Sequence, residues 1–295
     1  MFTCLPSPTG RKKEVPLPWV PPGFWLAGSR LERVYFAGMK MDESRRFVAA
    51  HTAPFLVWMG VMAALQAAEH VWEVPRVAHA WAYAAKTVAC GALLLWLKPW
   101  RGGGLATKNV SRHLPLAVGA GLLVAVLWIL PETPWVASRW PGFHAFYNTW
   151  LIGPPGKMPS YYDADMFPMP PPSHVSLAYS PMVCGWGLTL VKLLGTTLVI
   201  ATAEEYFFRG FLYRWLRNQD FTSISLGVYD APYFWIVVAV FAVEHDRWAG
   251  GAVAGAAYGG LALRAGDVRP AVLAHALTNF VLGVYVILSK QYGFW

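Results

Sequence analysis

Charge is scarce in this sequence. Asp, Glu, Lys and Arg make up 14% of the 295 residues, whereas soluble domains carry about 25%. Hydrophobic residues make up 56%, and the mean hydropathy is +0.38. This composition argues against a water-soluble globular domain and predicts a polytopic membrane protein whose constant partner is the lipid bilayer. The 16 Trp and 13 Tyr agree with it, because membrane interfaces favour both side chains.

Cysteine is nearly absent as well. Cys4, Cys90 and Cys184 form no CxxC pair, which excludes a disulfide framework and a thiolate metal site. The first 53 residues lack an uninterrupted apolar stretch, so we expect no cleavable signal peptide. The net charge of +8 is spread over loops rather than gathered on a basic face with interleaved aromatics, and we therefore expect no nucleic-acid partner.

Apolar runs of the length that crosses a bilayer recur along the chain. They predict an all-α fold, a polytopic membrane helix bundle of about seven to eight transmembrane helices. The predicted spans are 54–72, 77–97, 114–130, 182–203, 232–245, 248–265 and 269–288. The segment 204–217 either continues the fourth span or forms an eighth, and we expect a break in the helix nearby.

Three regions follow from this pattern. Residues 1–53 form a basic, Pro-rich N-terminal segment; residues 54–181 hold the first spans and a long Pro- and aromatic-rich loop; residues 182–295 form a C-terminal membrane domain. Eight Lys or Arg residues precede Pro54, whereas only Arg139 and Lys157 lie within 131–181. Because cytoplasmic loops carry the excess of basic residues, we predict a multi-pass cell (inner) membrane protein with a cytoplasmic N-terminus and an external 131–181 loop.

The C-terminal region also holds ionisable residues within apolar runs, where they usually face a bundle interior or a water-filled cavity. Glu205 and Arg209 are four positions apart, which predicts an ion pair on one helix face. Glu204 then points elsewhere without a partner, as a general base in an apolar site would. A charge cluster at a helix end is the structural alternative.

Two further apolar segments repeat this four-residue spacing. Phe241 and His245 share one predicted helix face, and His275 and Asn279 share another. A packed histidine, or hydrogen bonds between helices, would also account for each pair. Three predicted helices can nevertheless converge on one buried site that contains a carboxylate, two imidazoles and an amide.

The chemistry open to this set is narrow. No Ser or Cys stands in a nucleophile motif within it. A carboxylate and an imidazole can instead activate water, while a second imidazole and an amide stabilise an oxyanion. Alternatively, Glu204, His245 and His275 form a His₂Glu set of the kind that binds catalytic zinc. The sequence contains no HExxH, the commonest metalloprotease signature, and we expect no metal or other cofactor, with zinc as the alternative.

A non-catalytic membrane protein is the competing hypothesis: a scaffold, an immunity protein or a transporter-like bundle. Lys86 and Lys192 lie within predicted spans, where lysines sometimes line transport paths. Snorkelling or pairing between helices is the favoured explanation for both lysines.

The motifs resemble those of the CAAX protease and bacteriocin-processing family of intramembrane proteases, which includes the Rce1-type prenyl-protein endopeptidases. The family motifs EExxxR, FxxxH and HxxxN/D match residues 204–209, 241–245 and 275–279 in order. The resemblance covers about residues 182–290. The layout, with spans before this region and a long aromatic segment between, is also similar to the prokaryotic branch found alongside exosortase systems.

The resemblance implies an intramembrane endopeptidase that cleaves near the C-terminus of a membrane-anchored or lipidated protein. By the match, Glu204 and His245 activate water, and His275 and Asn279 form the oxyanion hole. Glu205, Arg209 and Phe241 have supporting roles.

Overall fold

The computed structural model describes residues 30–101, 111–152 and 177–295, with side chains described from Arg45 onward. The described residues are almost entirely helical and contain no strand. The helices are α1 (Arg30–Glu69), α2 (Arg76–Leu97), α3 (Leu114–Ile129), α4 (Pro134–Arg139), α5 (Pro141–Trp150), α7 (Pro181–Leu194), α8 (Ala201–Glu205), α9 (Tyr213–Arg217), α10 (Ala231–Val243), α11 (Trp248–Ala265) and α12 (Arg269–Ser289). Residues 153–176 of the predicted aromatic loop 131–181 lie outside the described residues.

A helix occupies each of the seven predicted spans. Five helical stretches are long and apolar enough to cross a membrane, and α10 is a shorter apolar helix. The five stretches are Arg45–Glu69, Arg76–Leu97, Ser111–Glu132, Pro181–Arg217 and Arg269–Ser289. The predicted all-α membrane bundle is therefore confirmed.

The chain divides into two compact units, residues 1–43 and residues 44–295. Helix α1 begins at Arg30, so part of the predicted N-terminal segment is helical and the first span begins before residue 54. Pro54 lies inside this helix and does not start it. The predicted boundaries at 53/54 and 181/182 stay predictions.

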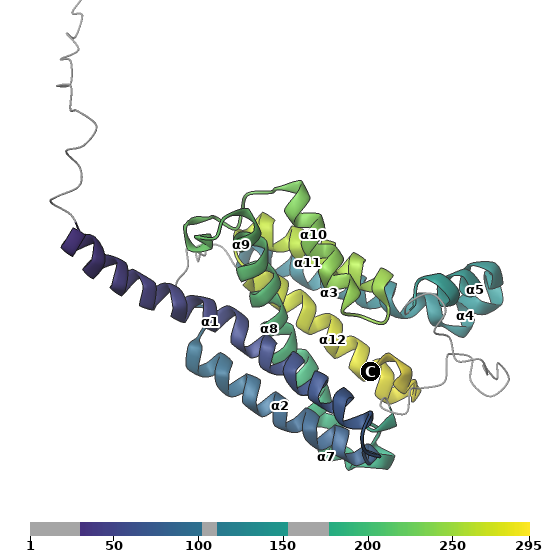
Figure 1. The fold of residues 1–295 in the computed structure, drawn as a ribbon. Helices are drawn as coiled ribbons and strands as arrows, with labels where there is room; N and C mark the ends of the chain where they lie inside the picture. Colours follow the sequence, from purple (N-terminus) through teal and green to yellow (C-terminus); the bar gives the residue numbers. More distant parts are fainter. Residues whose placement is uncertain (1–29, 102–110, 153–176) are drawn as a thin grey trace, which may run out of the picture. The chain divides into compact units, whose positions relative to one another are not determined.

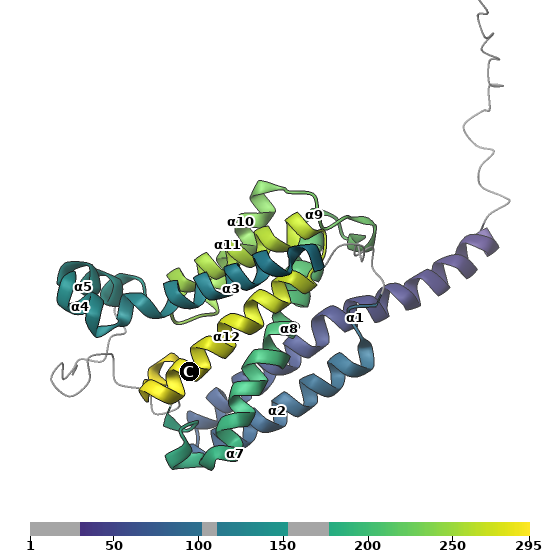
Figure 2. The ribbon, with the colours of Figure 1, turned by 180° about the vertical axis from the view of Figure 1, so that it is seen from behind.

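Helix α12 is the central element of the unit formed by residues 44–295. It packs against α3 and α11 on one side and against the α7–α8 helix on the other, as both views of the ribbon show (Figures 1 and 2). Helix α10 packs on α11, and α2 packs on α7. The helices of the first and third motifs therefore meet directly at α12, and α10 with the second motif joins them through α11 and the Tyr206–Leu212 turn.

The break expected near 204–217 is absent, and this expectation was wrong. The chain is helical from Pro181 to Arg217, with π-helical turns at Gly195–Ile200 and Tyr206–Leu212. The interruption lies instead at Gly185, whose φ of 77° suits glycine. A π turn absorbs an extra residue without ending the helix, and such turns are frequent at functional sites. Glu204 and Glu205 lie between the two π-helical turns of this helix.

Helices α3 and α12 approach closely at Gly121. A Cβ built on Gly121 would lie 2.6 Å from the backbone oxygen of Ala274, and that oxygen cannot rotate away. A Cβ on Gly119, two residues earlier in α3, would meet nothing within 4 Å. The close approach explains why a glycine occupies this helix-to-helix contact.

We expect Gly121→Ala and Gly119→Ala to change stability in opposite directions. The first should lower the unfolding free energy by about 1–3 kcal/mol through overpacking. The second should raise it by up to about 1 kcal/mol, because alanine has the higher helix propensity. Melting temperatures in detergent micelles measure both. Equal shifts for the two variants would show that the helices do not meet at Gly121.

Candidate active site

The predicted ion pair between Glu205 and Arg209 is present and buried. Arg209 Nη1 lies 3.0 Å from Glu205 Oε1, and the two side chains are 3% and 0% exposed. Arg209 Nη2 also donates to the backbone oxygen of Gly255 in α11, at 3.0 Å. The guanidinium lies 4.5 Å from the centre of the Phe241 ring. This arginine therefore connects the motif of the α8 region to both α10 and α11.

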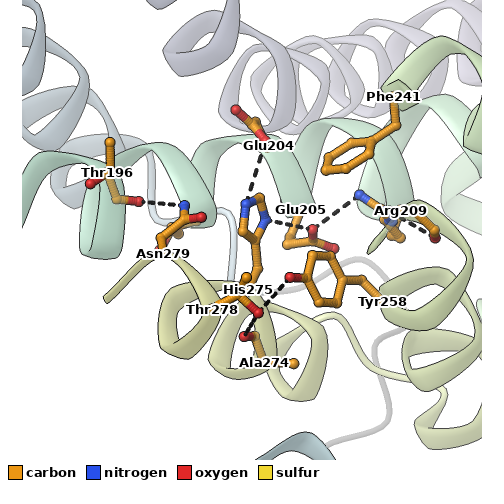
Figure 3. Close-up of polar contacts among 12 residues, drawn as sticks. Thr196, Glu204, Glu205, Arg209, Phe241, Tyr258, Ala274, His275, Thr278 and Asn279 are labelled. Atoms are coloured by element: carbon orange, nitrogen blue, oxygen red, sulfur yellow. Dashed lines mark hydrogen bonds and ion pairs between the residues drawn. The ribbon is translucent and has the colours of Figure 1, made fainter. Parts of the chain in front are cut away.

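Glu205 has a second partner that the sequence spacing did not indicate. Its Oε1 atom accepts a hydrogen bond from His275 Nδ1 of α12, at 2.9 Å. Figure 3 shows the imidazole between the two glutamates, with Glu205 on one side and Glu204 on the other. Because Nδ1 bonds to a carboxylate, it carries a proton. The ring therefore directs Nε2 towards Glu204.

Glu204 has a buried carboxylate oxygen, Oε2, without a hydrogen-bond partner among the described residues, as does Glu205 at its own Oε2 atom. His275 Nε2 lies 3.8 Å from Glu204 Oε2. A water molecule can bridge two polar atoms at such a separation. The predicted difference between the two adjacent glutamates is thus seen in the structure: Glu205 bonds to Arg209 and His275 through Oε1, whereas Glu204 has only the 3.8 Å approach of His275.

His245 follows the end of α10 and is held by its own helix. Its Nδ1 lies 2.8 Å from the backbone oxygen of Phe241, four residues earlier. The ring packs edge-on against Trp128 of α3, with centroids 5.5 Å apart. Since Nδ1 is the donor to that oxygen, Nε2 is the nitrogen left with a lone pair.

The loop after His245 is anchored by a buried ion pair. Arg247 Nη2 donates to Glu132 Oε2 at 2.8 Å, and Nη1 donates to the backbone oxygen of Gly293 at 3.0 Å. The two side chains are 8% and 1% exposed. These bonds join the end of α3, the α10–α11 loop and the C-terminal segment, and so restrict the position of His245.

Asn279 lies one turn after His275 on α12. Its Nδ2 atom donates to the backbone oxygen of Thr196, at 3.0 Å (Figure 3). Thr196 belongs to the π-helical turn Gly195–Ile200. An amide nitrogen has two N–H groups, so one remains for a ligand.

A single cavity of about 470 Å³ joins these side chains. Its walls include the four residues predicted to be catalytic: Glu204, His245, His275 and Asn279. Phe241 also lines the cavity, whereas Glu205 and Arg209 lie behind its wall. The structure thus brings the three motifs together as the convergence argument predicted, although the role of each residue remains a prediction.

Tyr258 of α11 is a member of the site that sequence reasoning missed. Its ring stacks on His275, with centroids 4.9 Å apart and planes at 19°. Its hydroxyl group lies 2.7 Å from Thr278 Oγ1, which donates to the backbone oxygen of Gly121 at 2.8 Å. The available signal was composition, since Tyr258 is a lone tyrosine in a helix rich in Gly and Ala.

The alternative zinc set does not fit this arrangement. Among the residues that the structure describes, no three His, Cys, Asp or Glu side chains lie close enough together to hold a metal ion. His275 Nε2 lies 3.8 Å from Glu204, but His245 does not join these two side chains in a ligand group. The chemistry derived below therefore contains no metal step.

Comparison with known proteins agrees with the motifs. Residues 186–281 match the family model of the type II CAAX prenyl endopeptidase Rce1-like family. No curated protein and no solved structure matches the chain. The matched segment contains all three motifs and every predicted catalytic residue, and the family's activity is CAAX-type intramembrane proteolysis. The resemblance stated from the motifs is therefore confirmed: residues 186–281 of this membrane protein are similar to the Rce1-like family.

Proposed function

We propose that this protein is an intramembrane endopeptidase that hydrolyses a peptide bond near the C-terminus of a membrane-anchored or lipidated protein. The observation that carries the proposal is the unbonded carboxylate oxygen of Glu204, facing a cavity that His245, His275 and Asn279 also line. Adjacent Glu205 accepts hydrogen bonds from Arg209 and His275 through Oε1, and its Oε2 is also unpaired, but Glu205 does not line the cavity. An unpaired buried polar atom is costly, and at Glu204 a water molecule or a substrate in the cavity can remove that cost.

Water activation is assigned to Glu204 and His245. The Glu204 carboxylate takes a proton from water as the oxygen attacks the scissile carbonyl carbon. His245 accepts the water's other hydrogen at Nε2, because Nδ1 is bonded to Phe241. When the tetrahedral intermediate collapses, the C–N bond breaks and the proton on Glu204 passes to the leaving amine. The products are a new carboxyl group, which keeps the second hydrogen of the water, and a new amine.

The oxyanion is assigned to His275 and Asn279. His275 can donate from Nε2 only as an imidazolium, and the Glu205 carboxylate bonded to Nδ1 stabilises that charge. Asn279 supplies its second N–H while the first holds Thr196. Donors held in place before the reaction stabilise the developing charge without rearrangement.

Within this proposal the protein spans the cell (inner) membrane with its N-terminus in the cytoplasm. The bilayer lets a tail anchored in lipid enter the cavity sideways. The prenylated substrates of the family's name are one class of lipidated tail, and a transmembrane-anchored tail is another.

Cleavage in proteoliposomes tests the function. Wild-type protein should cleave a panel of prenylated and transmembrane-anchored tail peptides near their C-termini, and a strong chelator should leave the rate unchanged. His245→Ala should lose most of this activity while keeping its melting temperature. Cleavage is read by mass spectrometry of the released fragment.

Two results would contradict the proposal. A rate lost in chelator and restored by zinc would favour the metalloprotease alternative. No cleavage of any tail peptide, together with binding of a membrane protein by both wild type and His245→Ala, would favour the scaffold or immunity protein.

A further inference from the structure

The cavity has a second polar region that the proposed chemistry does not use. Lys86 of α2 and Lys192 of α7 both line it, and they are 2% and 9% exposed. Their burial excludes snorkelling to an interface, because a snorkelling ammonium group reaches water. Both ammonium groups therefore lie inside the bundle, on the same cavity as Glu204.

Aromatic rings surround the two ammonium groups. Lys86 Nζ lies 4.1 Å from the centre of the Trp58 ring and 4.7 Å from that of Tyr83. Lys192 Nζ lies 4.2 Å from Tyr83 and 4.6 Å from Tyr179. The Tyr83 ring is thus shared by both lysines. Cation–π contacts partly replace the lost hydration of the two charges, but they supply no counter-charge.

No carboxylate of the described residues forms an ion pair with either lysine. Among the described residues, Lys86 Nζ donates to the thioether sulfur of Met62. Glu69, another carboxylate on the cavity, pairs with His79 at 3.0 Å. Two buried cations without a partner are expensive, and an anion entering the cavity would remove that cost.

We propose that Lys86 and Lys192 form a subsite for the free C-terminal carboxylate of the substrate tail. The inference rests on the proposed function, because a bond cleaved near a C-terminus leaves a short fragment that ends in a carboxylate. Such a carboxylate enters an apolar cavity only where cations replace its hydration. The subsite selects tails that end in the cavity over internal segments of a membrane protein.

Matched pairs of tail peptides, identical except for a C-terminal acid or amide, test this subsite. The liposomes are zwitterionic, so that no anionic headgroup competes. Wild type should show a kcat/KM about tenfold or more higher for the acid, the size of effect that a hydrogen bond to a charged group has. Lys86→Met/Lys192→Met should cleave both forms at the wild-type amide rate, with the loss in KM.

The double variant should fold, because apolar residues of similar volume replace buried charges without loss of stability in many proteins. Lys290→Met removes an exposed lysine away from the cavity and should keep the wild-type preference. An acid-to-amide ratio near one in wild type, or a ratio unchanged in the double variant, would overturn the subsite. Inhibition of both peptides by anionic lipid, only when the lysines are present, would instead assign them to a lipid phosphate.

Equilibrium binding separates this inference from the proposed function. Glu204→Gln, which should not turn over, is titrated with the same fluorescent acid and amide peptides. Tighter binding of the acid that depends on the lysines supports the subsite even if wild type cleaves nothing. Cleavage by wild type with equal binding of acid and amide supports the function and contradicts the subsite.

Discussion

Glu204→Gln is expected to lower kcat by a factor of about 10²–10⁴, the range that general acid–base catalysis contributes. The amide keeps the shape of the side chain but cannot take a proton from water. The fold should not change, because Glu204 Oε2 accepts no hydrogen bond among the described residues and has only the 3.8 Å approach of His275. Initial rates on the tail peptides and a melting curve in detergent measure the two effects separately.

Glu73→Gln is the matched control for this change. Glu73 is exposed in the turn between α1 and α2, and its substitution should leave kcat unchanged. A Glu204→Gln protein that keeps more than about a tenth of the wild-type rate would remove Glu204 from the role of general base. The open carboxylate would then be a packing feature of the cavity.

Arg209→Met should destabilise the protein by about 3–5 kcal/mol, the cost of leaving one buried ion without its partner. Glu205 is 0% exposed and would keep only the bond from His275. The backbone oxygen of Gly255 would lose its donor as well. The melting temperature in detergent is the measurement.

Arg217→Met, two turns later on the same helix, is the control. Arg217 lies 3.6 Å from Asp230, whose side chain is 34% exposed. Arg217 itself is 14% exposed. The loss there should be smaller than at Arg209, about 1 kcal/mol, because this pair is longer and partly open to water. Equal losses at positions 209 and 217 would contradict the buried ion pair.

A double substitution separates stability from activity. Arg209→Met/Glu205→Leu replaces the pair with apolar side chains and should recover much of the stability lost in the single variant. Activity should not recover, because His275 then lacks the carboxylate at Nδ1. Recovery of both would show that Glu205 acts only through Arg209.

The spacing of residues along the sequence predicted the helices and the side-chain pairs within each helix. Glu205 with Arg209 and Phe241 with His245 are contacts four residues apart, and the helix repeat alone brings such positions together. The sequence did not predict that the helix continues through residues 204–217, because several charged residues close together are typical of a helix end. A π turn and partners on other helices accommodate them instead.

Contacts between distant residues were beyond sequence reasoning. Glu205 and His275 are 70 positions apart, and Asn279 bonds to the backbone of Thr196, 83 positions away. Sequence showed that these groups needed partners inside an apolar segment. It did not show which group met which, because that depends on how three helices pack around α12.

The sequence by itself determined the membrane environment, the helical class, the three motifs and the inequality of the two adjacent glutamates. The low charged fraction and the helical spacing of residues indicate these properties without any knowledge of contacts between distant residues. Only the tertiary structure decided that Glu205 holds His275 while Glu204 stays open, and that Lys86 and Lys192 line the same cavity. The physical reason is that a charge buried away from water must be stabilised by groups on the neighbouring helices. Only the packing of those helices decides which groups they are.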